Sequence, residues 1–166
     1  MKPVKIETER LLLRPFRRTD APEFARLAGE WAVASMTSDI PYPFSAAQAM
    51  GWLRPVPGEV RFAIERERRL IGGAGYYRRP SGVAELGFWL GRPWWGHGYA
   101  TEAARCARAF AYRELGWTTL TSFIDPRNDP SLRVARRLGA MYERDVKLIE
   151  NWAGVYRHPG PAALQS

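Results

Sequence analysis

The sequence has a single cysteine and only two histidines among its 166 residues. Cys106 therefore has no partner for a disulfide within the chain, and there is no cysteine cluster to bind a metal. His97 and His158 lie too far apart in the sequence to match the spacing of a zinc site. We expect a protein without a metal site, in which Cys106 packs as a small apolar residue and makes a poor nucleophile.

Long hydrophobic runs are also absent, although hydrophobic residues make up 46% of the chain. No uncharged apolar run approaches the roughly 20 residues that a membrane-spanning helix needs. The N-terminal stretch has only Leu11, Leu12 and Leu13 between arginines, without the hydrophobic region and cleavage site of a signal peptide. The sequence therefore predicts no membrane helix and a cytoplasmic location.

Lysine is scarce in a chain whose formal net charge is +8. Lys2, Lys5 and Lys147 are the only lysines, so arginines carry almost all of the positive charge. The arginines are spread along the chain and form no basic tail, which argues against nucleic acid as the main partner. We find no repeat or linker and expect one domain over residues 1–166.

Apolar periodicity and turn residues predict seven strands and four helices. The expected strands cover residues 4–16, 59–65, 70–77, 83–90, 118–124, 141–149 and 152–158. A first helix is expected to begin at Asp20, with Phe24, Leu27 and Trp31 on one face. A loop containing prolines follows, and a short second helix is expected from about Ser45.

Two later helices are marked by their ends. Apolar residues recur at helical spacing from Tyr99 to Leu115, and Gly116 follows as a stop. Asp129 is a candidate cap for the last helix, with Pro130 at its first position and Gly139 past its end. This order of elements predicts an α+β fold whose mixed, mostly antiparallel sheet contains one parallel pair joined by a helix.

Gly96 and Gly98 stand between a predicted strand and the helix that begins at Tyr99. Glycines at a helix start leave the first backbone N–H groups unobstructed, which favours binding of an anion such as phosphate. The chain lacks the GxxxxGK[ST] motif, and Thr101 stands where the GxGxxG motif needs its third glycine. Neither nucleotide-binding motif is present, and a tight turn without a ligand stays an open alternative.

Three segments together carry a more specific signal. They are ETERLLLRPF from Glu7, AELGFWLGRPWWGHGYATEA from Ala84, and DPRNDPSLRVARRLGA from Asp125. With them the chain resembles the GNAT family of N-acetyltransferases, in particular its RimJ/RimL-like branch. The loop from Trp95 to Ala100 is similar to the family's Q/R-x-x-G-x-G/A motif, except that Trp95 replaces Gln or Arg. The resemblance implies a GNAT fold of about seven strands and four helices, with the parallel strands splayed at an acyl-CoA site.

The resemblance also implies an acetyl-CoA site whose diphosphate meets the backbone N–H groups of residues 97–101. The main chain of Phe88 and Leu90 is expected to pair with the pantetheine arm, and Phe88 N–H is the favoured donor to the thioester oxygen. The residues expected to bind the cofactor are Phe88, Trp89, Leu90, Trp95, Gly96, His97, Gly98, Tyr99, Ala100, Thr101 and Asn128.

Two residues are candidates for catalysis by the same resemblance. Glu85 corresponds to a general base in many relatives, and its apolar neighbours in sequence are expected to raise its pKa by desolvation. A carboxylate at a sheet edge paired with an arginine is the alternative. Ser131 is expected near the sulfur, while helix capping is the alternative for both Asn128 and Ser131. The tyrosine that many relatives carry seven positions after this asparagine is Ala135 here, so Ser131 becomes the better partner for the thiolate.

The implied reaction is acetylation of a primary amine by direct attack in a ternary complex, without an acyl-enzyme. The acceptor is a peptide N-terminus or a small molecule, and the chain is a monomer or homodimer. Tyr42, Phe44 and Trp52 are candidates to line the acceptor site; Tyr156 is a further candidate, whereas His158 is expected to be incidental. Two rival functions stay open: a basic module that binds RNA or ribosomes, and an acyl-CoA sensor without turnover.

Overall fold

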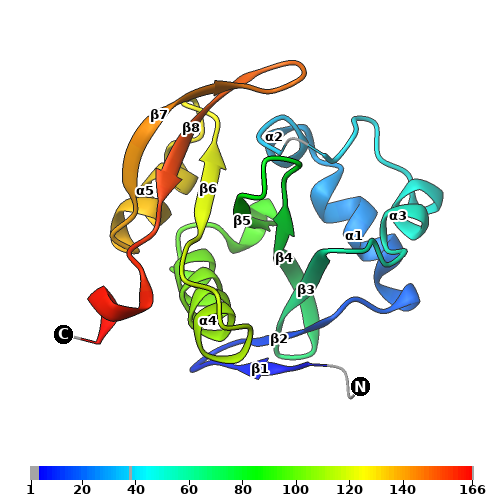
Figure 1. Ribbon diagram of the computed structural model, residues 1–166. Helices are drawn as coiled ribbons and strands as arrows, with labels where there is room; N and C mark the ends of the chain where they lie inside the picture. Colours follow the sequence, from blue (N-terminus) through cyan, green and yellow to red (C-terminus); the bar gives the residue numbers. More distant parts are fainter. Residues whose placement is uncertain (1–3, 38, 166) are drawn as a thin grey trace.

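The computed structural model describes residues 4–37 and 39–165, which form one eight-stranded sheet with helices on both faces (Figure 1). The strands are β1 (Ile6–Glu7), β2 (Leu12–Pro15), β3 (Glu59–Arg66), β4 (Arg69–Arg78), β5 (Ala84–Leu90), β6 (Thr121–Ile124), β7 (Met141–Lys147) and β8 (Trp152–Arg157). The α-helices are α1 (Ala21–Ala28), α2 (Trp31–Ala34), α3 (Ala46–Trp52), α4 (Tyr99–Glu114) and α5 (Asp129–Arg137). Short 3₁₀ helices are η1 (Arg18–Asp20), η2 (Arg92–Trp94) and η3 (Pro161–Leu164).

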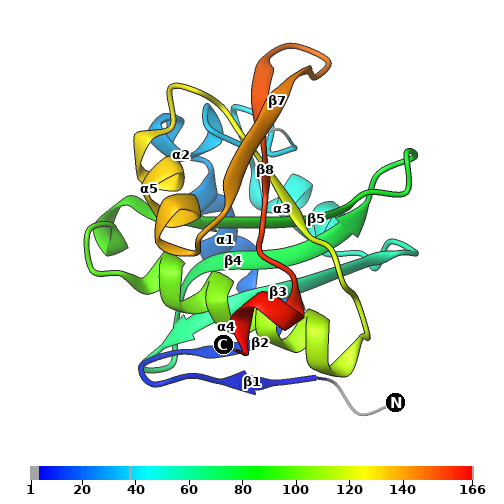
Figure 2. The same ribbon diagram turned by 60° about the vertical axis from the view of Figure 1, so that its left-hand side comes forward.

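The strand order in the sheet is β1-β2-β3-β4-β5-β6-β8-β7. Strands β1 to β5 pair antiparallel in sequence order, and α4 connects β5 to its parallel neighbour β6. The expected α+β fold, mostly antiparallel with one parallel pair, is therefore confirmed. In Figure 2, β7 and β8 run steeply across the direction of β3, β4 and β5, so the sheet twists strongly from one end to the other.

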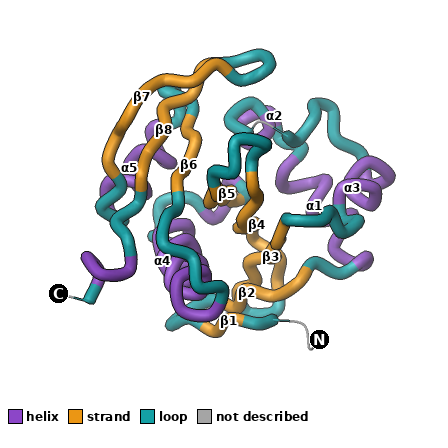
Figure 3. The backbone as a smooth tube through the Cα atoms, in the orientation of Figure 1, coloured by secondary structure: helices purple, strands orange, loops and turns teal. Residues whose placement is uncertain are grey.

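Alternating side chains of the strands supply two separate cores. On one face Leu86 and Leu90 of β5 are buried in the same cluster as the α4 alanines Ala103 and Ala107. On the other face Phe24 of α1 is buried in a second cluster with residues of α3, β3 and β4. Figure 3 shows α1, α2 and α3 to one side of the strands and α4 and α5 to the other. The candidate site described below lies where β5 and β6 meet between these layers.

Most predicted elements are present, and the short helix α3 begins as expected. Ser45 accepts a hydrogen bond from the backbone N–H of Gln48 at 3.1 Å, and the Gln48 side chain accepts in return from Ser45 N–H at 2.8 Å. This reciprocal capping box explains why α3 begins right after the proline loop.

The predicted single strand over residues 4–16 is wrong, because it is two strands joined by a turn. The backbone N–H of Thr8 donates to the Leu11 carbonyl at 2.9 Å, and the Thr8 hydroxyl reaches Glu102 of α4 at 2.7 Å. Glu102 also accepts from Arg10 N–H at 2.7 Å. A carboxylate far along the sequence thus fixes the turn, which adds an eighth strand to the seven expected.

Two expectations about helices are also wrong. Trp31 does not share a face of the first helix with Phe24, since α1 ends at Ala28 and Trp31 begins α2 with 62% of its surface exposed. The cap of α5 is Asn128 and not Asp129: the Asn128 side-chain oxygen accepts from Ser131 N–H at 3.2 Å. Asp129 becomes the first helical residue, where its charge favours the positive end of the helix dipole.

Candidate active site

Glu85 is a buried carboxylate inside the sheet, with 3% of its surface exposed. It lies on β5 between β4 and β6, so it is not at a sheet edge. One carboxylate oxygen accepts from the Tyr77 hydroxyl at 2.8 Å, and the other accepts from Arg79 Nε at 2.6 Å. The arginine partner of the alternative interpretation is therefore present, but in a buried setting.

Burial raises the pKa of Glu85 from 4.5 to about 7. Desolvation is the largest cause, and the nearby charge of Asp39 acts in the same direction. The charge of Arg79 and the hydrogen bonds from Tyr77 and Arg79 lower the pKa and offset part of that effect. A carboxylate with a pKa of about 7 can both accept and release a proton near neutral pH, as a general base must.

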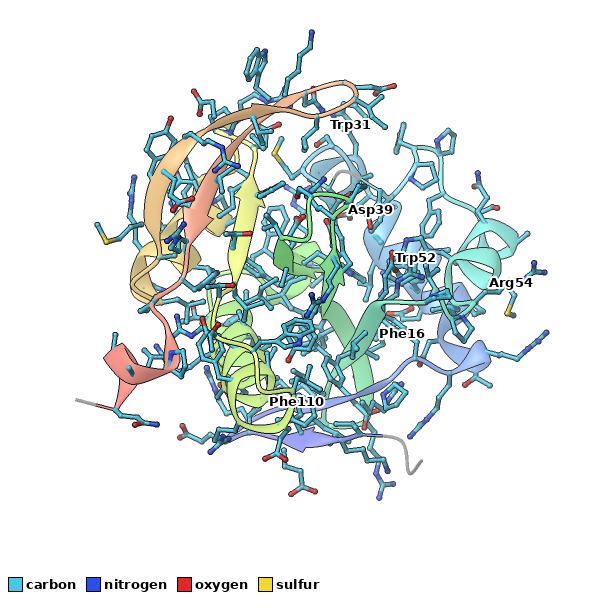
Figure 4. The ribbon with its side chains drawn as sticks, in the orientation of Figure 1. Phe16, Trp31, Asp39, Trp52, Arg54 and Phe110 are labelled. Carbon is cyan, nitrogen blue, oxygen red and sulfur yellow. The ribbon has the colours of Figure 1, made fainter. Side chains whose placement is uncertain are left out.

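A cavity of about 120 Å³ adjoins Glu85 on the side of α1, α2 and α3, and we call it the first cavity. Aromatic side chains line it, among them Phe16, Trp52 and Trp89. The rings of Phe16 and Trp52 meet edge to face at 5.9 Å, and Figure 4 shows both on the side of β4 where α1 and α3 lie. Asp39, labelled above them in the same view, also lines this cavity.

Two paired glycines leave one position of the sheet beside the first cavity without a side chain. Gly75 of β4 and Gly87 of β5 are register partners, and both line the cavity. A Cβ added at Gly87 would meet only Tyr77, at 3.9 Å, so the space above this residue is open. Because Glu85 and Gly87 project to the same face of β5, the bare position lies next to the carboxylate.

The parallel strands β5 and β6 part just beyond Glu85. Among the described residues their pairing consists of Glu85 with Thr121. The carbonyls of Ala84 and Leu86 accept from the hydroxyls of Thr121 and Ser122 on β6, at 3.2 and 2.8 Å. Since backbone groups two residues apart point the same way in a strand, the N–H and C=O of Phe88 also point toward β6, into the splay.

A second cavity, of about 540 Å³, opens on the other side of this splay. It is lined by the glycine loop and by residues of α2, β5 and α5. The residues that line both cavities are Met36, Thr37, Phe88, Trp89, Asn128 and Ser131. The two cavities therefore meet where β5 and β6 separate, close to Ser131 and to the main chain of Phe88.

The glycine loop has the conformation that the sequence predicts. Gly96 and Gly98 both have a φ of +78°, a backbone conformation that residues other than glycine rarely adopt. Gly98 is the N-cap of α4 and supplies no side chain, so the first N–H groups of the helix face outward without an intrahelical acceptor. Arg10 braces the loop through a hydrogen bond to the His97 carbonyl at 3.0 Å.

The second cavity fits an anionic ligand. The hydroxyl oxygen of Thr101 is buried and has no hydrogen-bond partner among the described residues, although Thr101 lines this cavity in the first turn of α4. Arg127, Arg133 and Arg137 line the same cavity. Diphosphate and phosphate groups would satisfy both the amides and these guanidinium groups.

Trp95, which departs from the family's loop motif, makes a hydrogen bond to the end of β5. Its indole N–H donates to the carbonyl of Leu90 at 2.8 Å. That carbonyl points toward the splay and was one of the groups expected to pair with a pantetheine arm. The tryptophan thus joins the loop to the end of β5, and Phe88 keeps its N–H and C=O directed at the open splay.

The other predicted cofactor residues are split between the cavity and its surroundings. Trp89, Tyr99 and Ala100 line the second cavity together with the glycines. His97 does not line it; its ring packs 5.5 Å from that of Tyr99. The Asn128 side chain caps α5, as the capping interpretation has it, and also lines both cavities.

The three predicted acceptor residues do not come together. Trp52 lines the first cavity, and its indole N–H is buried without a hydrogen-bond partner among the described residues. Phe44 is buried in the core, with its ring 5.1 Å from Phe24. Tyr42 is exposed and packs 4.9 Å from Trp31. Neither Tyr42 nor Phe44 lines either cavity.

Sequence reasoning missed several residues of the site. The sequence places Tyr77 only in a strand and Arg79 only in the turn after it, and it places Trp31 only on one face of the first helix, although Trp31 lines the second cavity. A signal for the arginines was present, because Arg133 and Arg137 are four residues apart and so share one face of α5. Cys106 is half-buried, and burial raises the pKa of its thiol, which disfavours a nucleophilic role.

Neither a metal cluster nor a membrane span stands out in the part of the chain that the structure describes. Within it, no three residues of the types His, Cys, Asp and Glu gather to hold a metal ion. Within the same part, no helix has both the length and the apolar character needed to cross a bilayer.

Comparisons with known proteins agree on one family. The family model described as acetyltransferase (GNAT) domain matches residues 10–141. The uncharacterized N-acetyltransferase p20 of Bacillus licheniformis is 27% identical over 157 residues, which cover 89% of this chain and 88% of that protein. The uncharacterized protein YkkB of Bacillus subtilis (strain 168) is 35% identical over 74 residues, so the match spans 45% of this chain and 43% of YkkB.

A solved structure shares the fold at lower identity. Mycobacterium smegmatis RimJ in complex with CoA-disulfide matches with a TM-score of 0.84 and 16% identity, over 100% of this chain and 93% of that one. At this identity the likeness shows a common fold.

Proposed function

The chain belongs to the acetyltransferase (GNAT) domain family, and we propose that it transfers the acetyl group of acetyl-CoA to a compact primary amine by direct attack in a ternary complex. Enzymes of this family use acetyl-CoA as acetyl donor. The observation that carries the proposal is the meeting of the two cavities at the β5–β6 splay, with Glu85 on one side and the glycine loop on the other. Donor and acceptor would enter from opposite sides.

On the donor side, the chain offers the groups that coenzyme A needs. The amides at the start of α4 and the Thr101 hydroxyl are proposed to hold the diphosphate, and Arg127, Arg133 and Arg137 the remaining phosphate charge. The main chain of Phe88 would pair with the pantetheine arm in the manner of an added strand. Bound in this way, acetyl-CoA supplies a thioester whose carbonyl oxygen Phe88 N–H is positioned to polarise.

On the acceptor side, Glu85 is proposed to receive the proton that the amine must lose before it attacks. Its pKa of about 7 suits this task at neutral pH. Ser131 is proposed to give a proton to the departing sulfur and to regain one from the nitrogen that has attacked, because it lines both cavities at the splay. The new N–C bond replaces the C–S bond, so the products are an amide and the free thiol of coenzyme A.

The size of the first cavity favours a small acceptor. Its volume of about 120 Å³ is below the roughly 150 Å³ of an apolar cavity that holds benzene. A single amino-terminal residue or a small alkyl amine would fit. The fold shared with RimJ supports the RimJ/RimL-like branch, and so an acceptor at a protein N-terminus is included in the proposal.

A thiol-release assay with acetyl-CoA, run over peptides and small amines, tests the proposal. We expect Glu85→Gln to lower kcat by about a hundredfold, as loss of a general base does, with little change in the binding of coenzyme A. Ser131→Ala is expected to lower kcat by a smaller factor. Binding of coenzyme A without thiol release by any amine would instead assign the chain as a sensor. Full turnover in both variants would overturn the two catalytic assignments.

A further inference from the structure

A buried series of hydrogen bonds, which we call the hydrogen-bond network, connects α4 to the carbonyl of Leu86 on β5. Arg108 Nη1 lies 3.3 Å from His158 Nδ1, and His158 Nε2 lies 2.8 Å from the Ser122 hydroxyl oxygen. The Ser122 hydroxyl donates to the Leu86 carbonyl at 2.8 Å. These hydrogen bonds thus join α4, β6 and the residue that follows β8 to the strand that carries Glu85.

The donor and the acceptor of every hydrogen bond in this network follow from the two groups at its ends, the Arg108 guanidinium and the Leu86 carbonyl. An arginine can only donate, so His158 Nδ1 must accept and its proton must be on Nε2. Nε2–H then donates to Ser122, and the Ser122 hydroxyl donates to the Leu86 carbonyl, which can only accept. All members are buried, with 4% of Arg108, 2% of His158 and 1% of Ser122 exposed. His158, expected to be incidental, is therefore a fixed part of the interior.

The role of His158 in this network is to orient and not to exchange protons. Burial lowers the pKa of His158 from 6.5 to about 4, and the charge of Arg108 acts in the same direction. The ring is therefore neutral at the pH where Glu85 titrates. The same Arg108 nitrogen, Nη1, also donates to the Leu138 carbonyl at 2.6 Å, which helps to fix the guanidinium.

The position of Ser122 coincides with the end of the β5–β6 ladder. Had the parallel ladder continued past Glu85 and Thr121, the N–H of Phe123 would have donated to the Leu86 carbonyl. The Ser122 hydroxyl takes that carbonyl instead. The next backbone groups of β5 that face β6 belong to Phe88, and they are the first ones left for a ligand.

We propose that Arg108, His158 and Ser122 form a clasp that ends the β5–β6 ladder at Leu86 and thereby positions the Phe88 N–H at the reaction centre. These are positioning residues, because they act through β5 and not on the reacting atoms. The inference rests on the proposed function, in which Phe88 N–H polarises the thioester. It adds a determinant of the splay that lies outside the cofactor loop and the catalytic pair.

The test compares Ser122→Ala with Thr121→Val in the full-length enzyme. Thr121 makes the neighbouring hydroxyl bond, to the Ala84 carbonyl, on the closed side of the ladder. We expect Ser122→Ala to lower kcat by about tenfold, since small displacements of a catalytic donor have large effects on rate. The KM for acetyl-CoA should change by less than about threefold, because the diphosphate site is untouched. Thr121→Val should keep kcat within about twofold of the wild type.

Two substitutions at His158 separate positioning from mere stability. His158→Gln keeps an N–H donor that can reach Ser122, whereas His158→Leu removes it. We expect Gln to retain most of the kcat and Leu to lose it, when both are assayed well below their melting temperatures. If Ser122→Ala yields no folded protein by circular dichroism, this pair carries the test.

The outcomes distinguish the clasp from the proposed function. Equal kcat for Ser122→Ala and Thr121→Val, or for the Gln and Leu variants, would overturn the clasp while wild-type turnover stands. A parallel loss of melting temperature and kcat in every variant, Thr121→Val included, would also overturn it. Absence of thiol release by the wild type with any amine would sink the proposed function itself.

Discussion

At the scale of single residues, the decisive feature is the balance of effects on Glu85. Burial raises its pKa to about 7, and Arg79 and Tyr77 keep the value from rising further. Without those two partners a carboxyl so deep in the sheet would stay protonated at neutral pH and accept no proton from an amine. In the proposed mechanism the ion pair with Arg79 therefore adjusts the pKa of the base.

This balance predicts the effect of removing the arginine. Arg79→Met deletes a charge and two donors that lower the pKa of Glu85, so the pKa should rise above its wild-type value of about 7. The rising limb of kcat against pH should shift to higher pH with the same acceptor. Arg78→Met is the matched control, since that arginine stacks over Trp117 and not on Glu85. An unshifted limb in Arg79→Met would contradict the role of Glu85 as the titrating base.

At this scale the sequence predicts the properties of residues that depend on their neighbours in the sequence. The apolar neighbours of Glu85 predicted its desolvation, and the glycines at 96 and 98 predicted an unobstructed helix start, where both residues have a positive φ. Sequence reasoning failed for His158, because the burial of that residue and its contacts with Arg108 and Ser122 depend on three elements packing together. No local pattern in the sequence carries that information.

At the scale of elements, the contacts that fix the start of α4 also fix the loop that is proposed to bind the cofactor. Gly98 caps the helix in a left-handed conformation, and the turn between β1 and β2 supports the loop through Arg10. Arg10 is itself held by Glu102 at 2.7 Å, so helix, loop and turn form one unit.

Gly98→Ala should weaken coenzyme A binding by about tenfold, equivalent to the loss of one charge-assisted hydrogen bond. The added Cβ strains a residue whose φ is +78° and meets Arg10 at 3.4 Å, so the amides of the loop shift. Gly116→Ala is the control, because Gly116 has a φ of +67° just past the other end of α4 and an open space around it. Isothermal titration with coenzyme A should find the loss of affinity in Gly98→Ala alone. Equal affinities would contradict the assignment of the loop.

The elements themselves were largely predictable, and the exceptions have local causes. Strong periodicity gave β3, β4, β5 and α4 within a few residues of their observed bounds. The strand over residues 4–16 is divided by a turn that Glu102 stabilises from α4, and Trp31 lies outside the first helix because the backbone becomes extended at Glu30. In both cases a contact or a turn overrode a pattern that looked continuous.

At the scale of the whole molecule, two buried groups make stability depend on pH in opposite directions. His158 has a lowered pKa, so the unfolded chain binds more protons than the folded one between about pH 4 and 6.5, and stability falls as pH falls. Glu85 has a raised pKa, so the folded chain binds more protons between 4.5 and about 7, and stability rises as pH falls. Each effect amounts to about 2 kcal/mol between about pH 7 and pH 5.

The two contributions should nearly cancel in the wild type and separate in variants. His158→Gln should gain stability on acidification from pH 7 to about pH 5 by about 2 kcal/mol relative to the wild type, and Glu85→Gln should lose a similar amount. Urea unfolding at both pH values measures these differences. Parallel pH dependence in all three proteins would show that neither group titrates as its burial requires.

A crystal structure of the complex would show whether acetyl-CoA lies across the splay of β5 and β6. We expect the diphosphate on the amides of residues 97–101 and the thioester oxygen within hydrogen-bond distance of Phe88 N. Coenzyme A bound elsewhere, with the glycine loop turned away from it or the splay closed by side chains, would show that the splay is not the cofactor site.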